Sequence, residues 1–143
     1  MIFLAADHAG YRLKEIVKSF LTFLNMEFED LGADTDESTD DYPDYAKKLV
    51  KKMKKKNDRG FLFCGSGVGM CMAANRYKEI RAATAGSEHA VIMSRIENDA
   101  NVLCLASRLT NEHAAKRFIK LFLDTPFSGE SRYKRRVKKL DSR

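Results

Sequence analysis

Short, mostly apolar runs alternate along the chain with longer segments in which apolar residues recur every three or four positions. The short runs predict β-strands and the longer periodic segments predict α-helices. Strands are expected at residues 2–6, 27–31, 60–64, 80–85 and 102–106. Helices are expected at residues 10–24, from Pro43 through a lysine-rich stretch, and at 68–76, 87–95, 111–123 and 129–140. Apolar strands separated by helices are typical of a parallel sheet covered on both faces.

Length and cysteine content narrow the class of protein. A chain of 143 residues can bury a continuous core, so we expect residues 1–143 to form one domain. The apolar start at residues 1–6 is too short to span a bilayer and carries no export signal. The three cysteines are odd in number and lack the close paired spacing of a zinc site. We therefore expect a cytoplasmic protein without a metal centre or membrane contact.

The net charge of +6 is concentrated in two segments. Seven lysines lie between Lys47 and Lys56, where apolar residues recur at helical spacing. This pattern favours the solvent-exposed side of an amphipathic helix over a surface that binds nucleic acid. Six further lysines or arginines lie between Arg132 and Lys139. This second cluster is less easily explained as a solvated face.

Cys64 ends the third predicted strand and is followed at once by a glycine-rich turn, Gly65-Ser66-Gly67-Val68-Gly69, that opens a helix. A thiolate there lies among backbone N–H groups at a positive helix-dipole end. The same turn can hold an oxyanion or a phosphate. It is neither a dinucleotide fingerprint nor a Walker loop, because the acid after the next strand and the Gly-Lys-Ser/Thr are missing. The leading interpretation is an enzyme.

Other chemically useful side chains follow the neighbouring strands. Asp7 and His8 come after the first strand, and Arg108 comes after the fifth. Ligands of parallel sheets bind beyond the carboxyl ends of the strands. We therefore expect a carboxylate, an imidazole, the Cys64 thiol and a guanidinium to lie close together at the edge of the sheet where its strands end. We call this edge the rim.

Six motifs, in order, resemble the ribose-5-phosphate isomerase type B family, whose fold the galactose-6-phosphate isomerase subunits share. The motifs are Asp7-His8-Ala9-Gly10, Asp41-Tyr42-Pro43-Asp44-Tyr45-Ala46, the Cys64 run with Ala73-Ala74-Asn75, Ile80-Arg81-Ala82-Ala83, Asn98-Asp99-Ala100-Asn101-Val102-Leu103 and Arg132-Tyr133-Lys134-Arg135-Arg136-Val137. The resemblance covers nearly the whole chain. It implies a Rossmann-like three-layer α/β/α sandwich with a five-stranded parallel sheet and an extra C-terminal helix.

The resemblance also implies a reaction. It is the interconversion of D-ribose 5-phosphate and D-ribulose 5-phosphate through an enediolate, a step of the pentose phosphate pathway that needs no cofactor or metal. Cys64 matches the family's base and Asp7 its partner in opening the sugar ring. Ser66, where the family commonly has threonine, would hold the enediolate oxygen with the N–H groups of Gly67, Val68 and Gly69. Gly65 belongs to the same substrate-binding turn.

The remaining site residues implied by the resemblance bind the phosphate and the sugar hydroxyls. Arg132 and Arg136 are i,i+4 neighbours on one helix face and would grip the phosphate with His8 and Arg108. Asn98 matches a residue that contacts a substrate hydroxyl. In the family the site lies between two subunits, so we expect a homodimer; whether two dimers form a tetramer stays open.

The sequence departs from the family at two histidines. Glu97 stands where the family has the second ring-opening residue, and Tyr133 replaces a histidine beside the phosphate arginines. Glu97 can transfer protons if burial raises its pKa. Two alternatives are that His89 takes over this step, or that Glu97 only caps its helix or pairs with Arg95.

Other functions stay open on the sequence alone. Allose 6-phosphate or galactose 6-phosphate are alternative substrates, because only pocket depth separates five-carbon from six-carbon sugars. A non-catalytic module that binds sugar phosphates is an alternative of another class. The retained Cys64 thiol argues against such a module, and the lysines' position along an ordinary core stripe argues against nucleic-acid binding.

Overall fold

The computed structural model describes residues 1–37 and 39–142. The strands are β1 (Ile2–Ala6), β2 (Phe28–Asp30), β3 (Arg59–Cys64), β4 (Ala82–Thr84) and β5 (Val102–Ala106). The helices are α1 (Tyr11–Phe23), α2 (Tyr42–Lys52), α3 (Val68–Ala74), α4 (Glu88–Ile96), α5 (Glu112–Asp124) and α6 (Ser131–Asp141). Their order matches the sequence prediction. The edge strands β2 and β4 are shorter than predicted.

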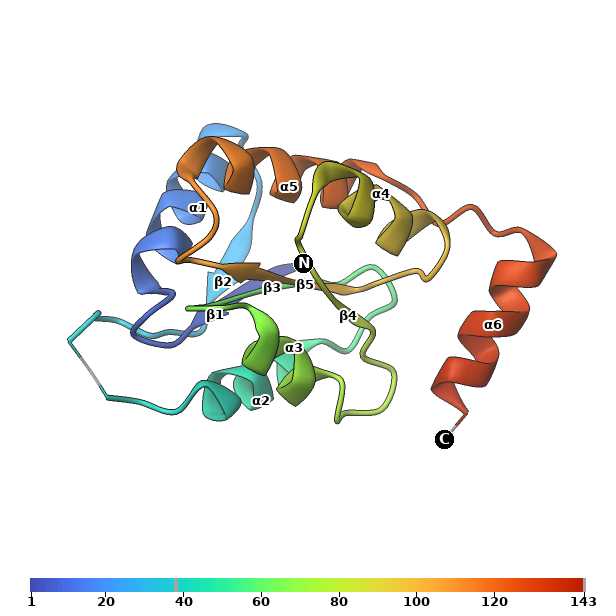
Figure 1. The fold of residues 1–143 in the computed structure, drawn as a ribbon, viewed down its shortest axis with the longest axis horizontal. Helices are drawn as coiled ribbons and strands as arrows, with labels where there is room; N and C mark the ends of the chain where they lie inside the picture. The colour runs from blue at the N-terminus through green and yellow to red at the C-terminus, as the bar shows by residue number, and fades with distance from the viewer. Residues whose placement is uncertain (38, 143) are drawn as a thin grey trace.

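All strand pairs are parallel, in the order β2-β1-β3-β5-β4. Figure 1 shows α1, α4 and α5 on one face of this sheet and α2 and α3 on the other. The predicted three-layer α/β/α sandwich with a five-stranded parallel sheet is therefore confirmed. Because β1, β3 and β5 lie in the middle, their carboxyl ends open onto one shared rim.

Two apolar clusters fill the space between the sheet and its helices. Phe61, in β3, points toward α5, where its ring meets Phe122 edge-on at 5.5 Å between centroids. Leu62, the next residue in β3, belongs to the cluster on the opposite face, with Leu49 of α2. This alternation follows from the two-residue period of a strand.

The lysine-rich helix is amphipathic, as predicted. In α2 the buried residues are Ala46, Leu49 and Val50, and the seven lysines between Lys47 and Lys56 are exposed. Lys52 pairs with Glu29 of β2 at 2.8 Å. The four lysines up to Lys52 thus form the solvated side of a helix whose other side belongs to the core, and Lys54, Lys55 and Lys56 lie in the exposed turn after it.

Helix α6 extends away from the layers, as Figure 1 shows in red. Tyr133 is the one buried residue among those of α6 that the structure describes. Near the end of the helix, Asp141 accepts two hydrogen bonds from Arg81, which lies just before β4. The described helices include none with the length and apolar character required to cross a membrane.

Candidate active site

The central strands place four predicted site residues on one rim. Cys64, the last residue of β3, lies in register with Ala106 of β5. The backbone N–H of Asp7, just after β1, donates to the Phe63 carbonyl at 3.3 Å, and that of Arg108 donates to the Gly65 carbonyl at 3.1 Å. The predicted convergence of carboxylate, imidazole, thiol and guanidinium is therefore present within one chain.

The Cys64 thiol is buried inside the glycine turn. The side chain is 4 % exposed, and the backbone N–H of Gly67 donates to its Sγ at 3.2 Å. Gly67 adopts φ 74°, which favours glycine, and its Cα lies close to the backbone of Ala106. The turn that carries the thiol is thus set by close backbone packing, and the Gly67 N–H points to the thiol itself.

The outer part of the turn is open to solvent. Ser66 is exposed, and its Oγ accepts the backbone N–H of Val68 at 3.3 Å. The Arg108 guanidinium lies directly over Gly65, where a Cβ atom would come within 2.6 Å of Cζ and Nη1. A Cβ atom on Gly69 would likewise come within 2.7 Å of Cζ of the Tyr42 ring. The turn therefore presents a hydroxyl and a guanidinium beside the thiol.

Asp7 is a buried carboxylic acid at this rim. It is 6 % exposed, and its Oδ1 accepts the backbone N–H of Gly10 at 3.0 Å. Burial raises the pKa of Asp7, although the hydrogen bond from Gly10 works in the opposite direction. A raised pKa makes Asp7 a better proton donor near neutral pH than an exposed aspartate.

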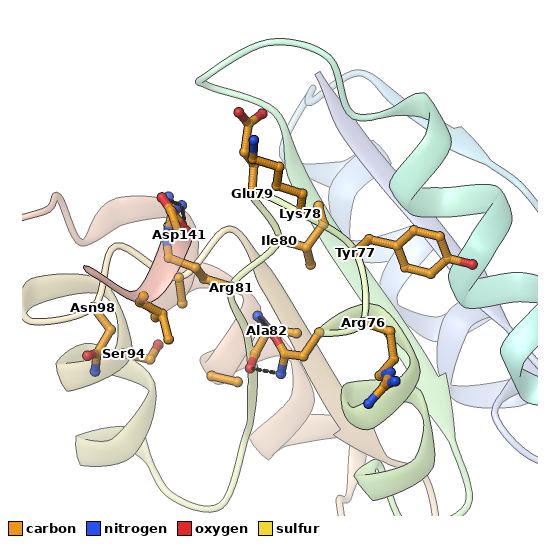
Figure 2. Close-up of a pocket in the computed structure, with 14 residues that line it drawn as sticks. Arg76, Tyr77, Lys78, Glu79, Ile80, Arg81, Ala82, Ser94, Asn98 and Asp141 are labelled. Carbon is orange, nitrogen blue, oxygen red and sulfur yellow. Dashed lines mark hydrogen bonds and ion pairs between the residues drawn. The ribbon is translucent and has the colours of Figure 1, made fainter. Parts of the chain in front are cut away.

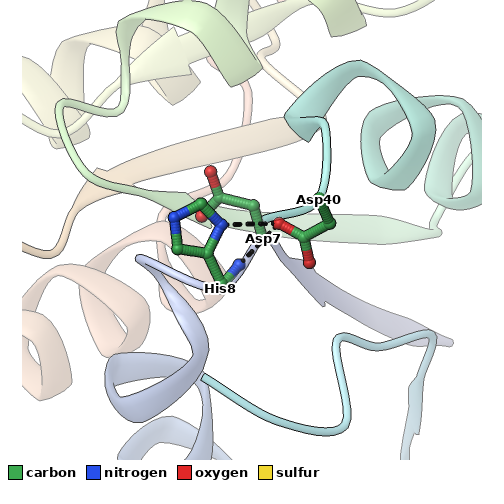
Figure 3. A group of neighbouring side chains, drawn as sticks. All are labelled: Asp7, His8 and Asp40. Atoms are coloured by element: carbon green, nitrogen blue, oxygen red, sulfur yellow. Dashed lines mark hydrogen bonds and ion pairs between the residues drawn. The ribbon is translucent and has the colours of Figure 1, made fainter. Parts of the chain in front are cut away.

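His8 is held by Asp40, a residue of the loop before α2. Figure 3 shows the imidazole turned toward Asp40, with Asp7 beside it. Asp40 Oδ1 lies 2.7 Å from His8 Nδ1 and also accepts the His8 backbone N–H at 3.0 Å. This hydrogen bond raises the pKa of His8. Burial opposes ionisation of Asp40, but the hydrogen bonds from His8 outweigh it and lower the pKa of Asp40.

Asp7, His8 and Asp40 are also the residues best placed to hold a cation in the described part of the chain. Their potential ligand atoms lie within 4.8 Å of one another. The His8–Asp40 bond already engages two of those atoms.

The other predicted site residues lie at the opposite edge of the sheet. Helix α4 starts beyond the carboxyl end of β4 and returns toward the start of β5, so Glu97 and Asn98 follow it at the amino edge. Arg132 and Arg136 belong to α6, on the same side. Asn98 lines a cavity of about 550 Å³ there, which Figure 2 shows with Asp141 of α6 on its border. Within one chain, the structure does not bring these four residues to the rim.

The environment of Glu97 bears on the alternatives left open by the sequence. Its backbone N–H caps α4 by donating to the Met93 carbonyl, and its Oε1 accepts the Tyr133 hydroxyl at 3.3 Å. Arg95 pairs with Asp99 at 2.8 Å. The Glu97 carboxylate is therefore held by α6. His89 is exposed in the first turn of α4.

Residues 2–140 match the model of a protein family described as Ribose/Galactose Isomerase. The chain belongs to this family. The match spans the segments that carry both the rim residues and the residues at the opposite edge of the sheet. The resemblance drawn from the six motifs is confirmed.

Solved members of the ribose/galactose isomerase family share the whole fold. The chain is 44 % identical to a ribose 5-phosphate isomerase from Thermotoga maritima, with a TM-score of 0.94 over 99 % of this chain and 97 % of that one. It is 42 % identical to ribose 5-phosphate isomerase B from Anaplasma phagocytophilum, with a TM-score of 0.92 over 97 % and 94 %. The Mycoplasma genitalium ribose-5-phosphate isomerase B, solved with bound ribulose-5-phosphate, is 40 % identical, with a TM-score of 0.88 over 97 % and 92 %.

Three residues at the two edges were not assigned a role in the site from the sequence. Asp40 lies in an acidic loop without apolar periodicity, 32 positions from the His8 it contacts. Tyr42 sits at the start of α2 and covers Gly69. Tyr133 was noted only as a departure from the family. A short motif shows only which residues are neighbours in sequence. These contacts join segments that are far apart in the sequence, so no motif could predict them.

Proposed function

We propose that this member of the ribose/galactose isomerase family interconverts D-ribose 5-phosphate and D-ribulose 5-phosphate, with Cys64 as the base. The observation that carries the proposal is the buried Cys64 thiol, which accepts the Gly67 N–H at 3.2 Å beside an acid, Asp7, whose pKa burial raises. The bound ribulose-5-phosphate of the M. genitalium relative supports the choice of substrate. The three free thiols suit a reducing compartment, so we place the reaction in the cytosol.

The proposed chemistry follows from this arrangement. Protonated Asp7 donates to the ring oxygen of the furanose while Glu97 of a second copy of the chain accepts the proton of the C1 hydroxyl, which opens the ring. The Cys64 thiolate then takes the proton from C2 of the aldose, which gives an enediolate. The Cys64 thiol returns this proton to C1 as the proton of the C2 hydroxyl moves to O1, which leaves the C2 carbonyl of the ketose. The Gly67 N–H, which points at Sγ, would stabilise the thiolate, and the exposed Ser66 hydroxyl would donate to the enediolate oxygen.

We further propose that a second copy of the chain completes the site as a homodimer. His8 and Arg108 of one protomer would share the phosphate with Arg132 and Arg136 of the other, and Glu97 and Asn98 of the second copy would face the sugar. The opposite positions of the two groups within one chain support this. Large apolar side chains are also exposed beside the rim, namely Val68, Met72 and Leu109 at 53 %, 67 % and 83 %.

The test is an assay of both directions in the presence of a metal chelator, with wild type, Cys64→Ser and Cys71→Ser. Cys71 is the matched control, because it lies on α3 and its Sγ contacts the Ala82 carbonyl at 3.3 Å. We expect Cys64→Ser to reduce kcat at least ~100-fold in both directions, the usual contribution of a proton-transfer group. Cys71→Ser should retain activity.

Three other results would contradict parts of the proposal. Activity of wild type from the ketose alone would show that ring opening fails. Activity only on six-carbon phosphates would assign the chain to the galactose branch of its family. Phosphate-dependent sugar binding without turnover of either sugar would favour a binding module.

A further inference from the structure

Tyr133 contacts three of the predicted site residues at the edge of the sheet opposite the rim, namely Glu97, Arg132 and Arg136. It is 9 % exposed, on a helix whose other described residues are half-buried or exposed. Its hydroxyl donates to Glu97 Oε1 at 3.3 Å and accepts from Arg132 Nη2 at 3.0 Å. The hydroxyl therefore joins the carboxylate to one of the two arginines by hydrogen bonds of consistent polarity.

The ring of Tyr133 contacts both arginines. The guanidinium carbon of Arg132 lies 4.7 Å from the ring centroid and that of Arg136 lies 5.8 Å from it. A cation is attracted to an aromatic face at such distances. One ring thus gathers two like charges on the same helix face. The further contact of Arg132, to Glu130 at 3.3 Å, joins two exposed side chains, and such pairs contribute little.

We infer that Tyr133 is a positioning residue that holds Glu97, Arg132 and Arg136 as one preassembled half-site. This inference rests on the proposed function. It divides the work of the side chain in two: the hydroxyl orients the Glu97 carboxylate and adds one hydrogen bond from Arg132, and the ring holds both guanidinium groups beside it. Glu97 and Tyr133 are the two departures from the family histidines, and here they are hydrogen-bonded to each other.

Two substitutions distinguish the role of the hydroxyl from that of the ring. Tyr133→Phe keeps the ring and removes the hydroxyl. We expect kcat from ribose 5-phosphate, which must be opened, to fall about tenfold, as for the loss of a hydrogen bond to a charged group. From ribulose 5-phosphate, which is acyclic, kcat should change less than about twofold. KM should rise only slightly, because Arg132 loses one hydrogen bond but keeps its contact with the ring. Tyr133→Leu keeps an apolar side chain but also removes the ring, so KM should additionally rise several-fold in both directions.

A readout that does not depend on turnover tests the arginines separately. Titration with inorganic phosphate, followed by calorimetry, should show only slightly weaker affinity for Tyr133→Phe, in which Arg132 loses one hydrogen bond but keeps the ring. Tyr133→Leu, in which both arginines lose the ring, should bind phosphate several-fold more weakly. Tyr77→Phe is the matched control, because Tyr77 packs against the apolar cluster under α2 and α3. It should behave as wild type in every assay.

The inference is overturned if Tyr133→Phe loses activity equally in both directions together with thermal stability, since that pattern belongs to a structural residue. It is also overturned if both Tyr133 variants match Tyr77→Phe. Failure of the proposed function looks different. Wild type would then be inactive on both pentose phosphates, while Tyr133→Leu would still weaken phosphate binding relative to wild type.

Discussion

The contact between His8 and Asp40 shows how one acidic residue favours the charged form of an imidazole that is proposed to bind phosphate. Because Asp40 raises the pKa of His8 above the ordinary value of 6.5, the imidazole stays protonated to a higher pH in the folded protein. The pair stabilises the fold fully below the ordinary pKa of His8, and this contribution is lost as pH rises through the raised pKa. At the acid end it is lost as pH falls through the lowered pKa of Asp40.

The first prediction concerns this pair. Asp40→Asn removes the charge that favours the imidazolium, so the pKa of His8 should fall toward its ordinary value. NMR titration of the His8 ring measures that shift directly. KM for the sugar phosphate should begin to rise at a lower pH in the variant, because a neutral imidazole attracts the phosphate dianion less.

The control is an acid of the same loop. Asp36 pairs with the exposed Arg12 at 2.8 Å, so Asp36→Asn should leave the His8 titration unchanged. An unchanged His8 pKa in Asp40→Asn would mean that the hydrogen bond orients the ring without affecting its charge.

At the scale of elements, two glycines control how close segments of the rim approach each other. A Cβ atom on Gly10 would lie 2.2 Å from the Phe63 carbonyl oxygen, which is backbone of β3. A Cβ atom on Gly65 would instead meet the guanidinium of Arg108, the far end of a flexible side chain. Glycine to alanine should therefore affect stability at Gly10 and substrate binding at Gly65.

The second prediction follows. Gly10→Ala should lower the free energy of unfolding by about 1–3 kcal/mol or more, because backbone must move to relieve the overlap. Gly65→Ala should leave stability nearly unchanged but displace Arg108, raising KM about tenfold through loss of a charge-assisted phosphate contact. Chemical denaturation and steady-state kinetics measure the two effects. Gly86→Ala, where a Cβ would meet nothing within 4 Å, is the neutral control.

The element order was predictable because the central strands are apolar along their whole length and each is followed by a helix. The edge strands were predicted too long. Each has only one neighbouring strand, and backbone N–H groups around the start of β4 bond to side chains instead of to a strand. Arg81, for example, was expected within a strand. Its backbone N–H instead bonds the Asn101 side chain, and its guanidinium binds Asp141.

The site was predictable to the extent that topology dictates it. Asp7, Cys64 and Arg108 follow strands that lie side by side, so their convergence follows from the parallel sheet. The hydrogen-bond partners of His8 and Glu97 do not follow from any apolar periodicity or short motif. Asp40 reaches His8 from an irregular loop, and Tyr133 reaches Glu97 across 36 positions. Such contacts depend on the folded path of the chain.

At the scale of the whole molecule, helix α6 is difficult to explain in a single chain. It has 11 residues and one buried side chain, Tyr133. Isolated helices of this length are marginal in water, so an amphipathic face normally needs a surface to pack on. Leu140 of α6 is 50 % exposed, and the apolar side chains near the rim are more exposed still. A second copy would cover these surfaces and place the arginines of α6 at a rim.

The last prediction tests this arrangement by complementation. Cys64→Ser and Arg136→Ala should each be inactive or nearly so, because each spoils both shared sites of a homodimer. When the two variants are co-expressed in equal amounts, half of the dimers should contain one copy of each. Each mixed dimer has one site with both native residues and one with neither, so activity should return to about one quarter of wild type. Co-expression of Cys64→Ser with Ser66→Ala is the control: both changes lie on the same rim, no native site forms, and activity should stay absent. If the first pair also stayed inactive while mixed dimers were present, Arg136 would have to serve the rim of its own chain.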